Sequence, residues 1–413
     1  MAAARSMREA AEQVVRRLQD AGHVAYYAGG CVRDMLLQRE PDDYDIATSA
    51  HPDEVCRIFR RTQQVGAKFG VVLVRISGHM IETATFRADL TYRDGRHPEG
   101  IRFTNAEEDA ARRDFTVNAM FFDPVRHEVV DYVGGQHDLA HRLLRAVGDP
   151  RQRFEEDHLR ILRAVRFAAK LGFRIDPATW EAMREMAPAL AKISPERIRE
   201  ELEAILTHPT RRAGFDLLCG CGGVRYLWPQ AEELASQVEV VAHLLDRLPP
   251  SVSFELALAA VLHRLSPPQA MAACEALRCS NHTRQKVGWL VARQSDLLRP
   301  ADLTLADLKL LMASPHFNDL WSLVVSRIAA EGLDPNVAEV VRQRIAAIPR
   351  EEIAPPPWID GTFLERLGLP KGPAYRQILD RLYYAQLNGT LADAEAAAAE
   401  AERLVRQHDS PIR

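Results

Sequence analysis

"YAGGCVRDMLLQREPDDYDIATSAHPDEV", residues 27–55, is the stretch that decides the fold and the chemistry of this chain. Gly29 and Gly30 precede an expected helix that begins at Val32, with Arg33 in its first turn. Glycine lets backbone N–H groups approach a phosphate closely, and a helix N-terminus favours an anion. The guanidinium of Arg33 can fork onto phosphate oxygens. The first half of the stretch therefore predicts a phosphate-binding turn.

The second half carries carboxylates, which repel phosphate unless a cation lies between them. Asp43 and Asp45 flank Tyr44, and on a strand both side chains point to the same side. Mg²⁺ commonly binds through one or two carboxylates together with substrate phosphates. Glu82, on a candidate neighbouring strand, offers a third carboxylate if the two strands pair. The alternative is that "PDDYD" is only an acidic turn.

The two halves together predict a nucleotidyl-transfer site. A metal would bridge the carboxylates to a triphosphate held by the glycines and Arg33. Two metals about 3.5–4 Å apart would stabilise the entering and leaving oxygens of an in-line displacement. The protein need form no covalent intermediate, because positioning and charge suffice.

A second cluster of charge follows in "EEDHLRILRAVRF", residues 155–167. Residues three and four apart share a helix face, so a single helix would project Asp157, Arg160 and Arg163 together, with Arg166 one step further. Apolar residues between them predict a partly buried helix whose charges line a cleft. The alternative is a surface helix held by salt bridges.

A third cluster, "ARRDFTVNAM", supplies Arg112, Arg113, Asp114 and Asn118. The alternative here is a capped helix start, with Asp114 as the cap.

Composition is that of a globular protein, with 47% hydrophobic and 27% charged residues among 413. This length predicts about two to four domains. No apolar run approaches the ~20 residues of a membrane helix, and the N-terminal stretch carries acids, so we expect a cytoplasmic protein without a membrane span. Net charge is −4, which argues against indiscriminate nucleic-acid binding but leaves room for a basic face.

The six cysteines are scattered and lack zinc-ligand spacing. Cys219 and Cys221 could bind metal or cycle redox, but an incidental pair of reduced thiols is the simpler interpretation.

Strand and helix patterns alternate up to residue 147 and give way to helices from residue 154. "VVLVRI" (71–76) and "MIETATF" (80–86) predict two strands joined by a turn at "SGH". "SPERIREELEAILTH" begins with Ser194 before Pro195, a helix-start signal. An α/β region followed by an all-helical remainder is the expected order.

Six stretches in order resemble the motifs of the class II tRNA nucleotidyltransferase family. They are "GGCVRDMLL…PDDYDIATSAHP", "IETATFR", "YRDGRHP", "RRDFTVNAM", "DYVGGQHDL" and "EDHLRILRAVRFAAKLGF". The family comprises CCA-adding enzymes, their CC-only and A-only relatives, and bacterial poly(A) polymerases. The resemblance runs from Tyr26 to Leu206 and is faint beyond.

The resemblance implies a role for each matching residue. Asp43 and Asp45 would hold Mg²⁺, whereas Glu82 is expected as a further catalytic carboxylate from the strand geometry alone. Asp157 and Arg160 match the family's protein template, in which side chains read the Watson–Crick edge of CTP and then ATP. A carboxylate accepts from the amino group that C and A both carry, and Arg donates to a ring nitrogen or carbonyl. The implied nucleotide-binding residues are Gly29, Gly30, Arg33, Arg113, Asn118, Asp157, Arg160, Arg163 and Arg166.

Two further stretches also resemble parts of the family. "ATFRADLTYRDGRHP" (84–98) matches the flexible loop that the family uses to switch from C to A addition, but His97 stands where a second Arg is usual. "LALAAVLHRLSP" resembles the place where some long relatives carry a phosphohydrolase with a His-Asp pair. Here Arg264 follows His263, so we expect a degenerate helical region that positions RNA.

The predicted fold class is α+β, with a nucleotidyltransferase-type head containing a small mixed sheet, then an all-helical neck, body and tail. The expected parts are an N-terminal helix (1–25), head (26–147), neck with the template helix (148–207), body (208–350) and tail (351–413). The helical part would hold tRNA by shape and phosphate contacts. Candidate contacts, each alternatively a plain surface charge, are Arg197, Arg199, Arg211, Arg212, Arg284 and Lys286.

The predicted function is template-independent addition of CCA to the 3′ end of tRNA, from CTP and ATP, with release of pyrophosphate. An A-only enzyme or a poly(A) polymerase shares every catalytic motif and stays open. "VGAKFGVVLV" is closer to the tRNA-specific branch. Nucleotidylation of a small molecule is disfavoured by the template residues, and an inactive RNA-binding protein by the intact Asp43–Asp45 pair. The sequence predicts no oligomeric state.

Overall fold

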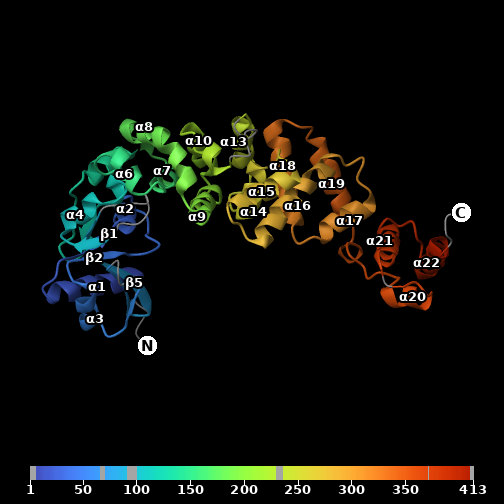
Figure 1. Cartoon of the computed structure of the whole chain (residues 1–413), viewed down its shortest axis with the longest axis horizontal. Coiled ribbons are helices and arrows are strands. Elements are labelled where there is room, and N and C mark those ends of the chain that lie inside the picture. Colours follow the sequence, from blue (N-terminus) through green and yellow to red (C-terminus); the bar gives the residue numbers. More distant parts are fainter. Residues whose placement is uncertain (1–5, 66–69, 91–99, 229–235, 371, 410–413) are drawn as a thin grey trace. The chain divides into compact units, whose positions relative to one another are not determined.

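The computed structural model describes residues 6–65, 70–90, 100–228, 236–370 and 372–409 (Figure 1). The chain splits into two compact units, Met1–Ala235 and Ser236–Arg413. The finer division into head, neck, body and tail stays a prediction.

The first unit contains a seven-stranded mixed sheet with the order β3-β4-β5-β2-β1-β8-β9. Strands β2 and β5 are parallel, and the other neighbouring pairs are antiparallel. The strands are β1 (Ala25–Ala28), β2 (Ile46–Thr48), β3 (Thr62–Gln64), β4 (Val71–Ile76), β5 (His79–Thr85), β8 (Phe121–Asp123) and β9 (Glu128–Val130). The predicted fold class, a head with a mixed sheet followed by helices, is confirmed.

The predicted hairpin is the β4–β5 pair. Ser77 and Gly78 connect the strands with φ angles of 51° and 91°, as a two-residue hairpin turn of the primed type requires. Along β5 the buried side chains of Ile81 and Thr83 alternate with the exposed side chain of Glu82. This alternation turns Glu82 away from the core.

Helices cover the sheet. Helices α1 (Met7–Asp20) and α3 (Pro52–Ile58) pack together against it, as Figure 1 shows. Helix α1 is amphipathic, and its Val14, Val15 and Leu18 are fully buried. The other helices near the sheet are α2 (Gly30–Leu36), α4 (Ala106–Ala111), a 3₁₀ turn (Thr116–Asn118) and α5 (Gly135–Ala140).

A second hairpin, β6 (Arg87–Asp89) with β7 (Ile101–Phe103), forms the base of the expected flexible loop. The Leu90 amide donates to the Gly100 carbonyl at 2.9 Å, so the two ends of the loop are tied together. Residues 91–99 of the expected loop, His97 among them, lie outside the described residues, as do residues 66–69 of "VGAKFGVVLV".

The rest of the first unit is helical apart from the short parallel pair β10 (Leu143–Leu144) and β11 (Arg174–Ile175). The single helix expected over 155–173 is wrong, because two helices meet at Asp157. The helices are α6 (Pro150–Glu156), α7 (Arg160–Leu171), α8 (Pro177–Met186), a 3₁₀ helix (Ala187–Lys192), α9 (Pro195–Leu206), α10 (Arg211–Gly220) and α11 (Val224–Leu227).

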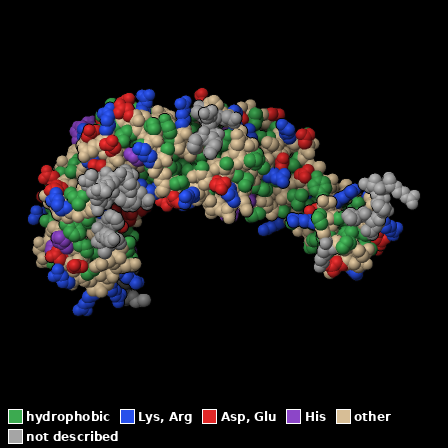
Figure 2. All heavy atoms as spheres, viewed as in Figure 1, with side chains coloured by type: hydrophobic (Ala, Val, Ile, Leu, Met, Phe, Trp, Pro, Cys, Tyr) green, Lys and Arg blue, Asp and Glu red, His purple; other side chains and the backbone are tan. Residues whose placement is uncertain are grey.

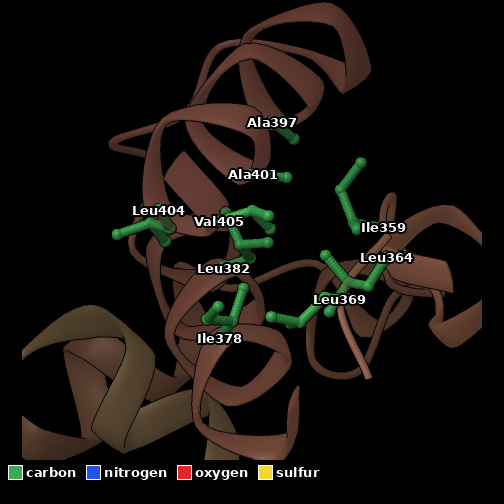
Figure 3. Packing of buried hydrophobic residues seen from close by; sticks show 9 residues of the cluster. All are labelled: Ile359, Leu364, Leu369, Ile378, Leu382, Ala397, Ala401, Leu404 and Val405. Atoms are coloured by element: carbon green, nitrogen blue, oxygen red, sulfur yellow. The ribbon is translucent and has the colours of Figure 1, made fainter. Parts of the chain in front are cut away.

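The second unit is helical in its described residues and has its own core. One cluster, drawn in Figure 3, joins Ile359, Leu364 and Leu369 to two long helices. No described helix is both long and apolar enough to cross a bilayer. The helices are α13 (Val238–Arg247), α14 (Phe254–Val261), α15 (Pro267–Ala276), α16 (Asn281–Leu298), α17 (Leu305–Ala313), α18 (Phe317–Glu331), α19 (Asn336–Ala346), a 3₁₀ turn (Arg350–Glu352), α20 (Gly361–Arg366), α21 (Pro373–Leu387) and α22 (Ala394–Asp409).

Acidic and basic side chains are interspersed over the face of the molecule seen in Figure 2. This mixture agrees with the small net charge of −4.

Candidate nucleotide-binding cleft

A cleft of about 590 Å³ in the first unit brings the predicted site residues together. Its size is within the range of small-molecule sites, about 300–1,000 Å³. Strand ends from the sheet form one wall, and the N-terminal part of α7 forms the other. Every site residue predicted from the sequence lines it: Gly29, Gly30, Arg33, Asp43, Asp45, Glu82, Arg113, Asn118, Asp157, Arg160, Arg163 and Arg166.

The glycine turn between β1 and α2 is sterically required. Gly29 has φ 75° and ψ −125° at the helix N-cap, a conformation that L side chains rarely adopt. A Cβ at Gly29 would also lie 2.9 Å from Nη1 of Arg113. Helix α2 begins at Gly30, two residues earlier than expected, so the backbone N–H groups of its first turn include that glycine.

Arg33 is buried at the start of the cleft and held by two partners. Its Nη1 donates to Oδ1 of Asn118 at 2.6 Å, and its Nε and Nη2 donate to Asp34, both at 2.8 Å. A guanidinium carries five N–H groups, so two remain for a phosphate oxygen. Asn118, a predicted nucleotide-binding residue, thus also fixes a neighbour.

The carboxylates gather because β2 and β5 are parallel neighbours. Ile46 lies opposite Thr83, so one step back along both strands places Asp45 opposite Glu82. The strand pairing on which the prediction for Glu82 depended is therefore confirmed. Asp43 and Asp45 lie in the extended segment before β2 rather than inside the strand.

These three carboxylates have no ion-pair partner among the residues that the structure describes. Within the described ranges, no Lys, Arg or His nitrogen lies within 4.0 Å of the side chains of Asp43, Asp45 or Glu82. Asp45 is exposed on the surface of the cleft, but the protein around it displaces part of its hydration, and this partial desolvation raises its pKa to about 6, with further increases from Asp43 and Glu82 and an opposing effect of Arg113. Within the described residues, the negative charge of this group is therefore offset only in part, by the more distant Arg113.

Such a set of oxygen donors fits a hard divalent cation. Among the residues that the structure describes, no group of three or more His, Cys, Asp and Glu side chains is arranged as a complete metal site. A metal here would complete its coordination with water and substrate phosphates, which is the usual arrangement for Mg²⁺.

The opposite wall pairs its arginines with carboxylates. Nε and Nη2 of Arg163 donate to Oδ2 of Asp114 at 2.8 and 2.6 Å. Arg166 donates to both oxygens of Glu201 at 2.7 and 3.3 Å. Burial alone would raise the pKa of Asp114, but the charge and hydrogen bonds of Arg163, with the charge of Arg160, hold it below its usual value. The alternative for Asp114, a helix cap, is wrong because the N-cap of the following 3₁₀ turn is Phe115, and that turn has no side-chain cap.

Asp157 does not lie on the helix that carries the arginines. It adopts an extended conformation, φ −147° and ψ 104°, between the end of α6 and the start of α7. Its Oδ1 accepts from the amide of Leu159 at 3.1 Å, which satisfies a free donor at the start of α7. Local helical spacing therefore gave the wrong geometry, although Asp157 and Arg160 still line the same cleft.

Arg197 of α9 binds Asp157 through two hydrogen bonds. Its Nη1 lies 3.1 Å from Oδ1 and its Nη2 lies 2.7 Å from Oδ2 of that carboxylate. The sequence placed Arg197 among candidate RNA contacts, but its partner is a residue of the cleft.

Arg160 is anchored by three acceptors. Its Nη1 donates to Oε2 of Glu156 at 2.6 Å and to the carbonyl of Arg153 at 2.9 Å, and its Nη2 donates to the carbonyl of Arg112 at 3.1 Å. Its side chain is only 11% exposed. The guanidinium is therefore fixed at the edge of the cleft.

The sequence marks Phe167 only as an apolar residue, but in the structure three arginines of the cleft lie against its ring. The guanidinium carbons of Arg33, Arg163 and Arg166 lie 5.4, 5.3 and 4.4 Å from the centre of its ring. Cation–π attraction operates within about 6 Å of a ring centre. In the sequence, only the three arginines that precede Phe167 at intervals of three residues indicate such a role.

Asp109 was also missed. It is 1% exposed and accepts hydrogen bonds from Arg112 and Arg113. These arginines lower its pKa against the opposing effect of burial. Their spacings of three and four from Asp109 were the available signal.

Other charged candidates lie elsewhere. Arg211 is buried and donates to the carbonyl of Leu206 at 3.0 Å, which argues against its predicted role in binding RNA. Lys286 lies 2.7 Å from Asp319 in the second unit. His263 is buried with its Nε2 3.3 Å from Glu331, and the same carboxylate binds Arg264. This arrangement is a charge cluster in a helical core.

Comparisons with known proteins place the chain in a family. Residues 25–145 match the model of the poly A polymerase head domain, and residues 172–234 match the probable RNA and SrmB-binding site of polymerase A. The CCA-adding enzyme of Geobacillus stearothermophilus is 35% identical over 91% of this chain and 92% of its own. That of Streptococcus gordonii is 36% identical over 94% of this chain and 95% of its own.

The fold agrees. The crystal structure of the Bacillus stearothermophilus CCA-adding enzyme in complex with CTP has a TM-score of 0.80 and 31% identity, covering 98% of this chain and 99% of that one. The Thermotoga maritima CCA-adding enzyme complexed with tRNA shares the fold, with a TM-score of 0.69 over 98% of this chain and 97% of its own at 19% identity. Similarity thus extends well beyond Leu206, the limit seen in the sequence. The chain belongs to the family of tRNA nucleotidyltransferases and poly(A) polymerases that contains the CCA-adding enzymes.

Proposed function

We propose that this protein adds C, C and A to the 3′ end of tRNA, taking nucleotides from CTP and ATP and releasing pyrophosphate. The observation that carries the proposal is a single cleft that combines uncompensated carboxylates with a wall of fixed arginines. Support for the substrates comes from relatives of 35–37% identity that are CCA-adding enzymes and from the structure of one of them with CTP.

The carboxylates would work with a divalent ion, on which this family generally depends. We propose Mg²⁺, held by Asp43 and Asp45 with Glu82 nearby. When bound, Mg²⁺ polarises phosphoryl oxygens and neutralises charge on the leaving pyrophosphate. The glycine turn and the two remaining N–H groups of Arg33 would hold the triphosphate, with Arg113 beside them.

The hydrogen-bond inventory of Asp157 and Arg160 supports a role in reading the base. An ionised carboxylate has about four acceptor sites. Three of those on Asp157 are occupied by Leu159 and Arg197, which leaves one on Oδ2. Three of the five N–H groups of Arg160 are used, which leaves two donors.

One acceptor beside a donor matches C and A. Each offers an amino group as donor and a ring nitrogen as acceptor on its Watson–Crick edge. U and G present a carbonyl where the amino group would be and a protonated ring nitrogen beside it. Asp157 and Arg160 would therefore accept CTP and ATP and reject UTP and GTP.

The test uses two purified tRNAs, one ending at the discriminator base and one ending in CC, with Mg²⁺ and each labelled NTP separately. Incorporation of CTP into the shorter tRNA, and of ATP into the CC-ended one, is the expected result. Extension of the CC-ended tRNA alone would identify an A-only enzyme, and long A tails on unrelated RNA would identify a poly(A) polymerase.

The helical second unit would supply tRNA contacts by shape and phosphate binding. Which residues do so, the boundaries of neck, body and tail, and the cytoplasmic location stay predictions.

A further inference from the structure

Helix α15 ends in a backbone motif that brings two cysteines together. The amide of Cys279 donates to the carbonyl of Cys274 at 3.0 Å, and the amide of Arg278 donates to the carbonyl of Glu275 at 2.8 Å. Arg278 has φ 49°, in the left-handed region. These features define a Schellman motif. In this motif the side chains of the two residues joined by the outer hydrogen bond, here Cys274 and Cys279, commonly touch.

In this motif the touching side chains are both thiols. A backbone N–H···O bond of 3.0 Å leaves the Cα atoms of the two residues roughly 5–6 Å apart from standard backbone dimensions. A disulfide needs Cα atoms about 4.4–6.8 Å apart. The thiol of Cys274 is also hydrogen-bonded to that of Cys279. The backbone hydrogen bond and the thiol contact thus place the two cysteines next to each other, at a separation compatible with a disulfide.

The two sulfurs differ in access. Cys274 is completely buried, whereas Cys279 is partly exposed between α15 and α16. The hydrogen bond between the two thiols, and then burial, raise the pKa of Cys274. Because Cys279 is the more accessible sulfur, an oxidant would meet it first; Cys274, which its raised pKa keeps as a thiol, would lose its proton as it attacks.

Cys219 and Cys221, the pair suggested by sequence spacing, are arranged differently. They lie two residues apart at the end of α10, and residues at that spacing do not face each other on a helix. The Sγ of Cys221 donates instead to the carbonyl of Leu218 at 3.3 Å.

We propose that Cys274 and Cys279 are a modification site at which a peroxide forms an intrachain disulfide. Peroxide oxidises the Cys279 thiol to a sulfenic acid and is reduced to water. The sulfur of Cys274 then attacks that of Cys279, the S–O bond breaks, and a second water leaves with the two protons. Overall, two thiols and one hydrogen peroxide give one disulfide and two waters. A thiol reductant reverses the change.

The chain provides a direct assay, because Arg278 lies between the two cysteines. Trypsin cleaves after Arg264, Arg278 and Arg284, so it yields peptides 265–278 and 279–284. The folded full-length protein is treated with one equivalent of hydrogen peroxide, alkylated, denatured and digested without reductant. We expect the two peptides to remain joined by a disulfide, 2 Da lighter than their sum, and to separate on reduction.

Substitutions of single cysteines test whether Cys274 and Cys279 are the two that form the disulfide. Cys219→Ser should leave the joined peptide at wild-type yield, whereas Cys279→Ser and Cys274→Ala should abolish it. Circular dichroism verifies that each variant is folded, and Cys279→Ser is at a partly exposed helix end that tolerates the change. The proposal is overturned if the two peptides of the folded wild type are alkylated and separate, or if they join only after oxidation of the denatured chain.

Discussion

The carboxylates on the two walls of the nucleotide cleft lie in opposite electrostatic environments. On the strand side, Asp43, Asp45 and Glu82 have no basic partner among the described residues, and the pKa of Asp45 is raised to about 6. On the helical side, Asp114 is bound to Arg163, and its pKa is lowered. Repulsion among the carboxylates of the first wall would be relieved by a cation, which would also bridge them to a triphosphate, whereas the charge of the second wall is neutralised before any ligand arrives. Negative charge is thus functional on one side and structural on the other.

The largest expected effect comes from removing a carboxylate of the strand wall. Asp45→Asn should lower nucleotide addition by at least about a thousandfold, because the metal bridge to the triphosphate is lost. Asp43→Asn should act similarly, and Glu82→Gln should have a smaller effect. Single-turnover extension of tRNA measures the rates, with Asp53→Asn on α3 as an exposed control. A variant of Asp45 that keeps a tenth of the wild-type rate contradicts the assignment.

Asp45→Asn should not lower the free energy of unfolding. A folded-state pKa of about 6, above the usual 3.8, means that the folded chain holds the proton more tightly than the unfolded chain. Stability therefore falls as pH rises from about 4 to 6, and the loss persists above pH 6. Asp45→Asn removes this loss, so the metal-free variant should be as stable as wild type at pH 7, or more stable by on the order of 1 kcal/mol after allowance for solvent access. Thermal unfolding at pH 5 and pH 7 measures the difference.

The helical wall should respond in the opposite sense. Asp114→Asn leaves the partly buried Arg163 without its anion and should destabilise the folded state by about 2–3 kcal/mol. Activity should also fall, by roughly ten- to a hundredfold, because Arg163 loses its position. Urea unfolding and tRNA extension give the two numbers. Equal stability of Asp114→Asn and Asp45→Asn would remove the distinction between the walls.

Nucleotide choice should depend on Asp157, the helical-wall carboxylate bound to Arg197, more than on Asp45 or Asp114. Asp157→Ala removes the acceptor for the amino group, a charge-assisted hydrogen bond of about 1.5–3 kcal/mol, or roughly ten- to a hundredfold in selectivity. The ratio of kcat/KM for CTP and ATP to that for UTP and GTP is the measurement. Unchanged ratios would mean that Asp157 and Arg197 form only a structural ion pair.

The smallest expected effect tests Phe167. Phe167→Leu keeps an apolar side chain but removes the π face shared by three arginines, and each such contact contributes about 0.5–1 kcal/mol at exposed sites. KM for the nucleotide should rise roughly three- to tenfold with a smaller change in kcat, and Phe167→Tyr should restore it. Phe215→Leu, a buried phenylalanine of α10 in the same unit, is the control for lost volume. An equal change of KM in both leucine variants would assign Phe167 to packing alone.

The sequence revealed the strand wall better than the helical wall. The glycine turn, the Asp43–Asp45 spacing and the β4–β5 hairpin are local patterns, and they predicted the turn, the shared side of the carboxylates and the strand pair, although α2 begins earlier than expected and the two aspartates precede β2. The helical wall depends on pairs far apart in sequence, such as Asp114 with Arg163 and Asp157 with Arg197. No local pattern specifies such a pair.

The break at Asp157 had a similar cause. Apolar spacing across 155–167 is compatible with one helix, and the extended residue that separates α6 from α7 is stabilised by its side-chain bonds to Leu159 and Arg197. Tertiary contacts thus overrode a continuous helical pattern.

The order of nucleotides at the new 3′ end tests the central claim most directly. A tRNA that ends at the discriminator base is incubated with the full-length protein, Mg²⁺ and all four NTPs, and single product molecules are sequenced. The structure predicts growth by C, C and A followed by a stop, with U and G absent above background. Products that carry runs of A, or none that carry C, would contradict it.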